Sequence, residues 1–200
     1  MSAGATGRTR RWTVVIPVRP AGKSRLELDG IDRPEMARAI ALDTIAAASS
    51  VANVRVVSSD RPLELPGTTL VLEPEARGIA EAVRRGLDQI TGRRAVLLGD
   101  VPGLDPADLV AALDLAELED LGAVADAEGT GTTLVTAREG VDLVPSFGPD
   151  SWRRHVEAGF SPLDVPATST LRRDVDLAEH LVGRLGPRTS ALLQGAQPRQ

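Results

Sequence analysis

"AVLLGDVPGLDPADL", residues 95–109, contains the end of one predicted element and the beginning of the next. Its opening apolar run is typical of a strand buried on both faces. The run stops at Gly99 and is followed by a carboxylate, Asp100. Because an unpartnered Asp is costly to bury, Asp100 is either a turn residue in water or a ligand for a positively charged group. Asp105 and Pro106 then have the residue types of a helix N-cap and a first helical position.

Strand and helix patterns alternate in both directions from this stretch. Strands are predicted over 12–18, 54–60 and 68–74, helices over 34–50 and 78–90, and two short strands around a glycine-rich turn over 122–137. Further helices are predicted to begin near Pro149 and, with Asp174 and Asp176 in the first turn, over 172–186. This alternation predicts an α/β fold with a doubly wound, mostly parallel sheet that helices cover on both faces.

The length of 200 residues suits a single core of this class. We expect one domain over residues 12–187. The polar and basic start, "MSAGATGRTRR", and the end, "GAQPRQ", have little to bury. Residues 1–11 and 188–200 are therefore predicted to be tails.

Composition excludes several classes of function. A formal net charge of −5 is unfavourable for a nucleic-acid binder, which needs a basic face. The absence of cysteine excludes disulfides, thiolate metal sites and cysteine nucleophiles, and only two histidines are present. No apolar run has the length of a membrane span, and the first residues do not resemble a secretory signal. We expect a cytoplasmic protein with small-molecule partners, no nucleic acid and no membrane.

Polar clusters follow the predicted strands at one edge of the sheet. They are "RPAGKSR" (19–25), "SSD" (58–60), Asp100, "GTGTT" (129–133) and "GPDS" (148–151). In open α/β sheets, ligands bind outside the carboxyl ends of the strands. The clusters therefore predict a binding site at that edge.

The first cluster carries three cations, Arg19, Lys23 and Arg25, on a loop that contains a glycine. Such a loop can surround a phosphate chain with backbone N–H groups and positive charge. It matches neither the P-loop nor the dinucleotide fingerprint. The alternative is a solvated basic loop.

Carboxylates make up the second set of candidates, Asp100, Asp174 and Asp176. Oxygen ligands suit magnesium, which usually takes one or two carboxylates together with substrate phosphates. For Asp174 and Asp176 the alternative is helix capping, since acidic residues favour a helix N-terminus. Together with the basic loop, the three carboxylates favour a metal site.

Anion sites are predicted at two further places. Ser151 lies at a helix start with free backbone N–H groups, and Thr132 and Thr133 supply hydroxyls beside glycines that permit close approach of a ligand. For the adjacent residues 153–155 the alternative is a solvated helix face. Two anion sites beside a metal indicate two phosphorylated substrates.

With these residues in place, the chain resembles the 2-phospho-L-lactate guanylyltransferase family, whose actinobacterial members act on phosphoenolpyruvate in coenzyme F-420 biosynthesis. The resemblance extends from Trp12 to Leu185. It rests on the ordered motifs "KSRL" (23–26), "ALDTIAAA" (41–48), "LLGDVPGL" (97–104), "GTGTTLVTA" (129–137), "SFGPDSWRRH" (146–155) and "DVDLAEHL" (174–181). The family has a nucleotidyltransferase fold similar to that of GT-A nucleotide-sugar enzymes.

The resemblance implies a role for each cluster. It implies that Asp100 and the "DVD" segment hold magnesium and that Lys23 and Arg25 grip the triphosphate of GTP. It also implies that Thr133, Gly148 and Ser151 line the pocket for a phosphorylated three-carbon acid. Gly78 opens "GIAEAV" (78–83), where family members tend to have "GLNAAL" near the nucleotide base. Ala80 therefore lacks the amide of the usual asparagine.

We expect GMP transfer from GTP to phosphoenolpyruvate or 2-phospho-L-lactate with release of pyrophosphate. The alternatives are a related nucleotidyltransferase with another base or acceptor, such as 3-phosphoglycerate, a sugar phosphate or a molybdopterin, and a catalytically silent nucleotide-binding module. The sequence leaves the oligomeric state open, a homodimer included. It also leaves open a hand-off of the product to a downstream transferase.

Overall fold

The computed structural model describes residues 12–18, 26, 28–59, 63, 65–73, 75 and 77–196. They build one sheet, ordered β3-β2-β1-β4-β6-β5-β7. The strands are β1 (Trp12–Pro17), β2 (Asn53–Ser58), β3 (Thr68–Leu72), β4 (Arg93–Leu97), β5 (Leu121–Ala125), β6 (Thr132–Ala137) and β7 (Ser161–Pro162). Strand β6 runs antiparallel to both of its neighbours, and every other neighbouring pair is parallel. The expected α/β fold with a mostly parallel sheet is confirmed.

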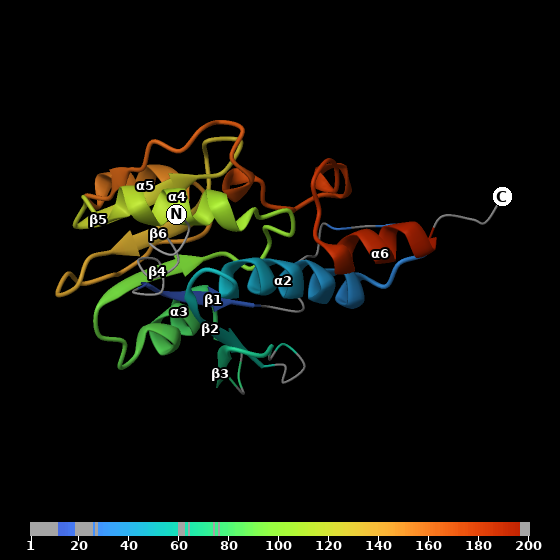
Figure 1. Ribbon diagram of the computed structural model, residues 1–200, viewed down its shortest axis with the longest axis horizontal. Helices are drawn as coiled ribbons and strands as arrows, with labels where there is room; N and C mark the ends of the chain where they lie inside the picture. Colours follow the sequence, from blue (N-terminus) through green and yellow to red (C-terminus); the bar gives the residue numbers. More distant parts are fainter. Residues whose placement is uncertain are drawn as a thin grey trace, which may run out of the picture.

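Helices cover both faces of this sheet (Figure 1). They are α2 (Arg33–Ser49), α3 (Ile79–Leu87), α4 (Pro106–Ala116), α5 (Ser151–Glu157) and α6 (Pro187–Ala196), with 3-10 turns η2 (Thr170–Arg172) and η3 (Ala178–His180). Helices α2 and α4 contribute buried apolar side chains to one core cluster. Helix α3 contributes to a second core cluster, and Trp152 of α5 packs against that second cluster. Within the described ranges no helix is both long and apolar enough to cross a bilayer.

Local sequence explains where α2 and α4 begin. The side chains of Asp32 and Asp105 accept hydrogen bonds from the backbone N–H groups of Glu35 and Ala107, and a proline follows each cap. An N-cap acceptor satisfies one of the donors left free in the first turn, and proline at the first position of α4 (Pro106) or the second of α2 (Pro34) loses no helical hydrogen bond. The predicted start of the helix after β4 is therefore confirmed.

Two predictions near the C-terminus are wrong. Residues 172–186 do not form an α-helix, because the chain makes only the two short 3-10 turns there. Residues 188–196 are not a tail, because they belong to α6, which lies alongside one end of α2 (Figure 1). The buried carboxylate of Asp43 on α2 accepts hydrogen bonds from the N–H groups of Arg188 and Thr189, so α6 receives its N-terminal cap from another helix.

The antiparallel strand β6 determines what lies at the carboxyl edge of the parallel strands. Its pairing places Leu134 opposite Leu97, so the turn that precedes β6 lies beside the end of β4. The N–H of Leu98 donates to the carbonyl of Thr133 at 2.9 Å. The "GTGTT" turn and Asp100 therefore meet at one edge, as the sequence predicts.

Candidate active site

Asp100 is held at the end of β4 by its neighbours in the chain. Gly99 passes so close to β1 that an added Cβ would lie 3.2 Å from the Val18 side chain and 3.3 Å from the Pro17 carbonyl. On the other side, the N–H of Val101 donates to the Thr44 hydroxyl of α2 at 3.1 Å. Thr44 itself donates to the Ile40 carbonyl. The turn that carries Asp100 is thus fixed by β1 and by α2.

The segment with Asp174 and Asp176 is tied directly to this turn. The N–H of Val175 donates to the carbonyl of Asp100 at 2.9 Å. The Val175 side chain is buried in a third apolar cluster with Met36, Ile40 and Leu181. Burial of Val175 in this cluster anchors the segment between its two acidic neighbours.

The three carboxylates converge. Asp100, Asp174 and Asp176 each have one carboxylate oxygen within 4.8 Å of the other two. Desolvation, followed by repulsion from Asp100, Asp176 and Asp126, raises the pKa of Asp174 to about 7. Clustered negative charge and hard oxygen donors are the surroundings that a divalent cation prefers. The donor set therefore fits magnesium or manganese.

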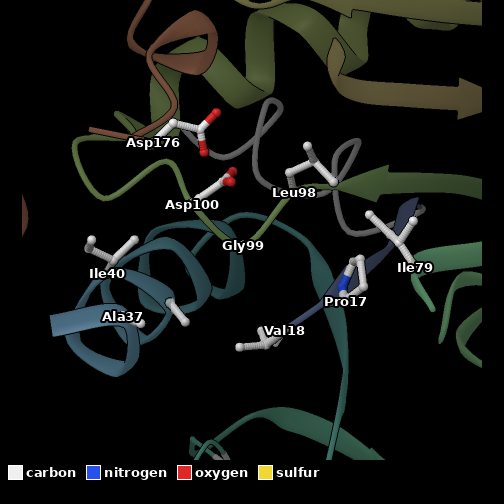
Figure 2. Close-up of a pocket in the computed structure, with 10 residues that line it drawn as sticks. Pro17, Val18, Ala37, Ile40, Ile79, Leu98, Gly99, Asp100 and Asp176 are labelled. Carbon is white, nitrogen blue, oxygen red and sulfur yellow. The ribbon is translucent and has the colours of Figure 1, made fainter. Parts of the chain in front are cut away.

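A cleft opens beside the carboxylates (Figure 2). It lies between the ends of β1 and β4, helix α2 and the start of α3, and its lining residues are Pro17, Val18, Ala37, Ile40, Ala41, Ile79, Leu98, Gly99, Asp100 and Asp176. Asp100 and Asp176 lie at one side, with the apolar side chains opposite (Figure 2). The predicted residue Gly78 is the N-cap of α3, next to Ile79, and has a φ of 113°. Arg19, Lys23 and Arg25 lie outside the described residues.

The predicted anion-binding residues form a second group. Thr133 and Ser151 are buried, and the Thr133 hydroxyl has no hydrogen-bond partner within the described part of the chain. Gly148 has a φ of 119°, which favours glycine, two residues before the N-cap of α5. The N–H of Trp152 donates to the Thr130 carbonyl, so the start of α5 is joined to the turn before β6.

Sequence reasoning missed Asp126, which organises this turn. Its buried carboxylate accepts hydrogen bonds from the N–H groups of Thr130 and Gly131, at 3.0 and 2.6 Å. The guanidinium of Arg172 donates to the Asp126 carbonyl. An Asp before a glycine-rich turn is a frequent acceptor for turn N–H groups, and this pattern is visible in "ADAEGTG" at 125–131. Asp126 thus connects the "GTGTT" turn to the segment that carries Asp174.

The alternative that residues 153–155 form a solvated helix face is correct for Arg153 and wrong for His155. Arg153 is exposed and pairs with Glu157 on the next turn of α5. His155 is fully buried, with its ring between those of Phe147 and Phe160. Its partners, Thr132 and Ser146, are distant in sequence, so nothing in the local pattern marks it.

Several solved structures share the fold of this chain. A nucleotidyl transferase from Methanothermobacter superposes with a TM-score of 0.59 at 16% identity, covering 92% of this chain and 99% of that one. CMP:2-keto-3-deoxy-manno-octonic acid synthetase in complex with CTP gives 0.52 at 16% identity, covering 94% and 100%. Rv0371C of Mycobacterium tuberculosis, in complex with manganese, gives 0.59 at 19% identity, covering 93% and 99%. At these identities the likeness shows the fold alone.

Sequence comparison is more specific. A phosphoenolpyruvate guanylyltransferase of Geodermatophilus obscurus is 42% identical over 209 residues, covering 94% of this chain and 96% of its own. Another, of Sanguibacter keddieii, is 38% identical and covers 91% and 84%. Residues 12–160 match the family model described as "Guanylyl transferase CofC like". The chain belongs to the CofC guanylyltransferase family.

Proposed function

We propose that this protein transfers GMP from GTP to the phosphate of phosphoenolpyruvate and releases pyrophosphate, as a step of coenzyme F-420 biosynthesis. The observation that carries the proposal is the convergence of Asp100, Asp174 and Asp176 beside a cleft at the carboxyl edge of the sheet, in a chain of this family. The proposal places the enzyme in the cytoplasm, where nucleoside triphosphates are available.

The reaction is an in-line displacement at phosphorus. A phosphate oxygen of the acid forms a bond to the α-phosphorus of GTP, and the bond from that phosphorus to the bridging oxygen of pyrophosphate breaks. Because the attacking phosphate is already an anion near neutral pH, no side chain has to remove a proton. Catalysis then requires alignment of two polyanions and relief of their repulsion.

In the proposal, the acidic cluster relieves the repulsion between the two substrates by holding a cation. Asp100, Asp174 and Asp176 would hold magnesium, which when bound neutralises phosphate charge. Without a cation the three carboxylates would repel both substrates. Metal binding is therefore a condition for substrate binding in this proposal.

Each substrate has its own part of the site. In the proposal the cleft beside Ile79 takes the nucleotide, with Gly78 near the base and with Arg19, Lys23 and Arg25 on the phosphates. The acid binds at Thr133, Gly148 and Ser151. The buried Thr133 hydroxyl supports this assignment, because a ligand oxygen would supply the partner that it lacks among the described residues.

The test is pyrophosphate release from the purified protein with magnesium. GTP, ATP, CTP and UTP are each combined with phosphoenolpyruvate, 2-phospho-L-lactate and 3-phosphoglycerate, and the nucleotide product is identified by mass. We expect release only with GTP and phosphoenolpyruvate. If 2-phospho-L-lactate were preferred, it would be the acceptor in place of phosphoenolpyruvate. If a nucleotide other than GTP were preferred, the guanylyl assignment would be contradicted, and the missing amide at Ala80 would be the expected cause.

A further inference from the structure

His155 is a buried titratable group for which the proposed reaction provides no role. Its ring on α5 has no exposed surface and meets Phe147 and Phe160 edge-on, with ring centroids 5.3 and 5.0 Å away. The N–H of Ser146 donates to its Nε2 at 2.9 Å, and its Nδ1 lies 3.0 Å from the Thr132 hydroxyl. Both ring nitrogens are therefore engaged.

These contacts define the tautomer. A backbone N–H can only donate, so Nε2 must carry the lone pair and the proton must be on Nδ1. Burial, together with the positive charge of Arg154, lowers the pKa of His155 to about 4, which keeps the ring neutral near pH 7. The Nδ1–H therefore donates to Thr132, and the Thr132 hydroxyl has to direct its own proton elsewhere.

The ring stands between the two segments that form the proposed acid site. Thr132 precedes Thr133 in the turn that leads into β6, and Ser146 begins the segment that ends at Ser151. The guanidinium of Arg154 also donates to the Ser146 carbonyl at 3.0 Å. Side chains of α5 thus hold both backbone groups of Ser146.

We propose that neutral His155 is a positioning residue, which joins Thr132 to Ser146 and thereby fixes the distance between Thr133 and Ser151 across the site for the phosphorylated acid. It touches no reacting atom. This inference rests on the proposed function, because that function assigns the acid to these two segments. Supporting hydrogen bonds behind a binding group hold it in the productive geometry.

The test measures binding of phosphoenolpyruvate by calorimetry, with magnesium and without GTP. His155→Phe keeps an aromatic ring and removes both hydrogen bonds, so we expect the dissociation constant to rise by roughly tenfold or more. His155→Gln places an amide oxygen near the position of Nε2 and keeps an acceptor for Ser146. His155→Asn places an amide N–H near Nδ1 and keeps the donor to Thr132. Each of these two variants should bind with intermediate affinity.

Phe160→Leu is the matched control, since it removes packing volume beside the ring and no hydrogen bond. It should lower the melting temperature and leave the dissociation constant within about twofold of wild type. In steady state, His155→Phe should raise the KM for the acid and leave the KM for GTP unchanged. An unchanged dissociation constant in His155→Phe, or an equal rise in Phe160→Leu, would overturn the proposal.

Two readouts do not depend on the substrate. Nitrogen-15 NMR of the imidazole should show the neutral Nδ1–H form at pH 7, and His180→Gln identifies the signal because the chain has only two histidines. Amide hydrogen exchange over 146–151 should accelerate in His155→Phe and not in Phe160→Leu. If wild type binds no phosphoenolpyruvate, the proposed function fails, whereas slow exchange that persists in His155→Phe contradicts the positioning role itself.

Discussion

At the scale of single residues, Asp100 is the carboxylate on which the acidic cluster depends, because it is rigidly held and belongs to both the cluster and the cleft. Asp100→Asn keeps the shape of the side chain and removes its charge. We expect kcat with magnesium to fall by roughly 10²-fold or more, since a divalent cation contributes several kcal/mol to such reactions. The fold should persist, because Val175 contacts the backbone of Asp100.

Steady-state kinetics and thermal unfolding check this prediction. The control is Asp120→Asn, which neutralises an exposed carboxylate paired with Arg138, outside the acidic cluster. That variant should keep wild-type turnover. Wild-type kcat in Asp100→Asn would contradict the metal assignment.

Asp174 gives a second prediction at this scale, on the dependence of stability on pH. Its pKa is raised to about 7 in the metal-free protein, above the ordinary value of 3.8, so between these values the folded chain binds a proton that the unfolded chain does not. The contribution of this group to the free energy of unfolding therefore falls as pH rises from about 4 to about 7. Magnesium should reverse that trend, because bound metal favours the charged carboxylate.

Thermal unfolding in EDTA between pH 5 and pH 8 measures the effect. In Asp174→Asn the decrease toward pH 8 should be smaller than in wild type, and magnesium should stabilise this variant less. An identical pH dependence in both proteins would show that Asp174 does not titrate in this range. The comparison requires no activity.

At the scale of elements, helix α2 positions the site through one buried side chain. Thr44 accepts the hydrogen bond from Val101, directly after Asp100, and donates to Ile40. Thr44→Val keeps the shape and leaves a buried N–H without its acceptor, so we expect a loss of about 1–3 kcal/mol in the free energy of unfolding. Turnover should fall as well, because Asp100 loses this support.

Urea denaturation and kcat measure the two effects. Thr44→Ser retains the hydroxyl and should recover most of the turnover, even though a methyl group is lost from the core. If Thr44→Val had the stability and turnover of wild type, α2 would not support the position of Asp100.

The elements that sequence predicts correctly are those with a local cause. Strand β4 follows from its apolar run, and α4 follows from Asp105 and Pro106. The "DVDLAEHL" segment has an equally regular pattern, but the Val175 N–H donates to Asp100, more than seventy residues earlier, and is not available to a helix. The polar clusters at the sheet edge were predictable from strand topology, whereas burial of His155 depends on partners that only the folded chain brings near.

At the scale of the whole molecule, the C-terminal helix α6 adds side chains to the apolar cluster that holds the acidic segment in place. Leu192 and Leu193 of α6 pack against the cluster that contains Met36, Ile40 and Val175. Val175 separates two of the three carboxylates, so its anchoring determines where they point. We predict that deletion of residues 187–200 lowers the melting temperature and weakens manganese binding, because Val175 loses part of its packing.

Calorimetry with manganese, together with thermal unfolding, tests this prediction without any substrate. Deletion of only residues 197–200 keeps α6 complete and is the matched control, with wild-type affinity expected. A point variant measures the contribution of the α6 cap separately from the contribution of the helix. Asp43→Asn weakens the acceptor for the N–H groups of Arg188 and Thr189, and it should reproduce part of the loss. Wild-type manganese affinity in the longer deletion would mean that the acidic cluster is held by Asp100 and Val175 alone, independently of the end of the chain.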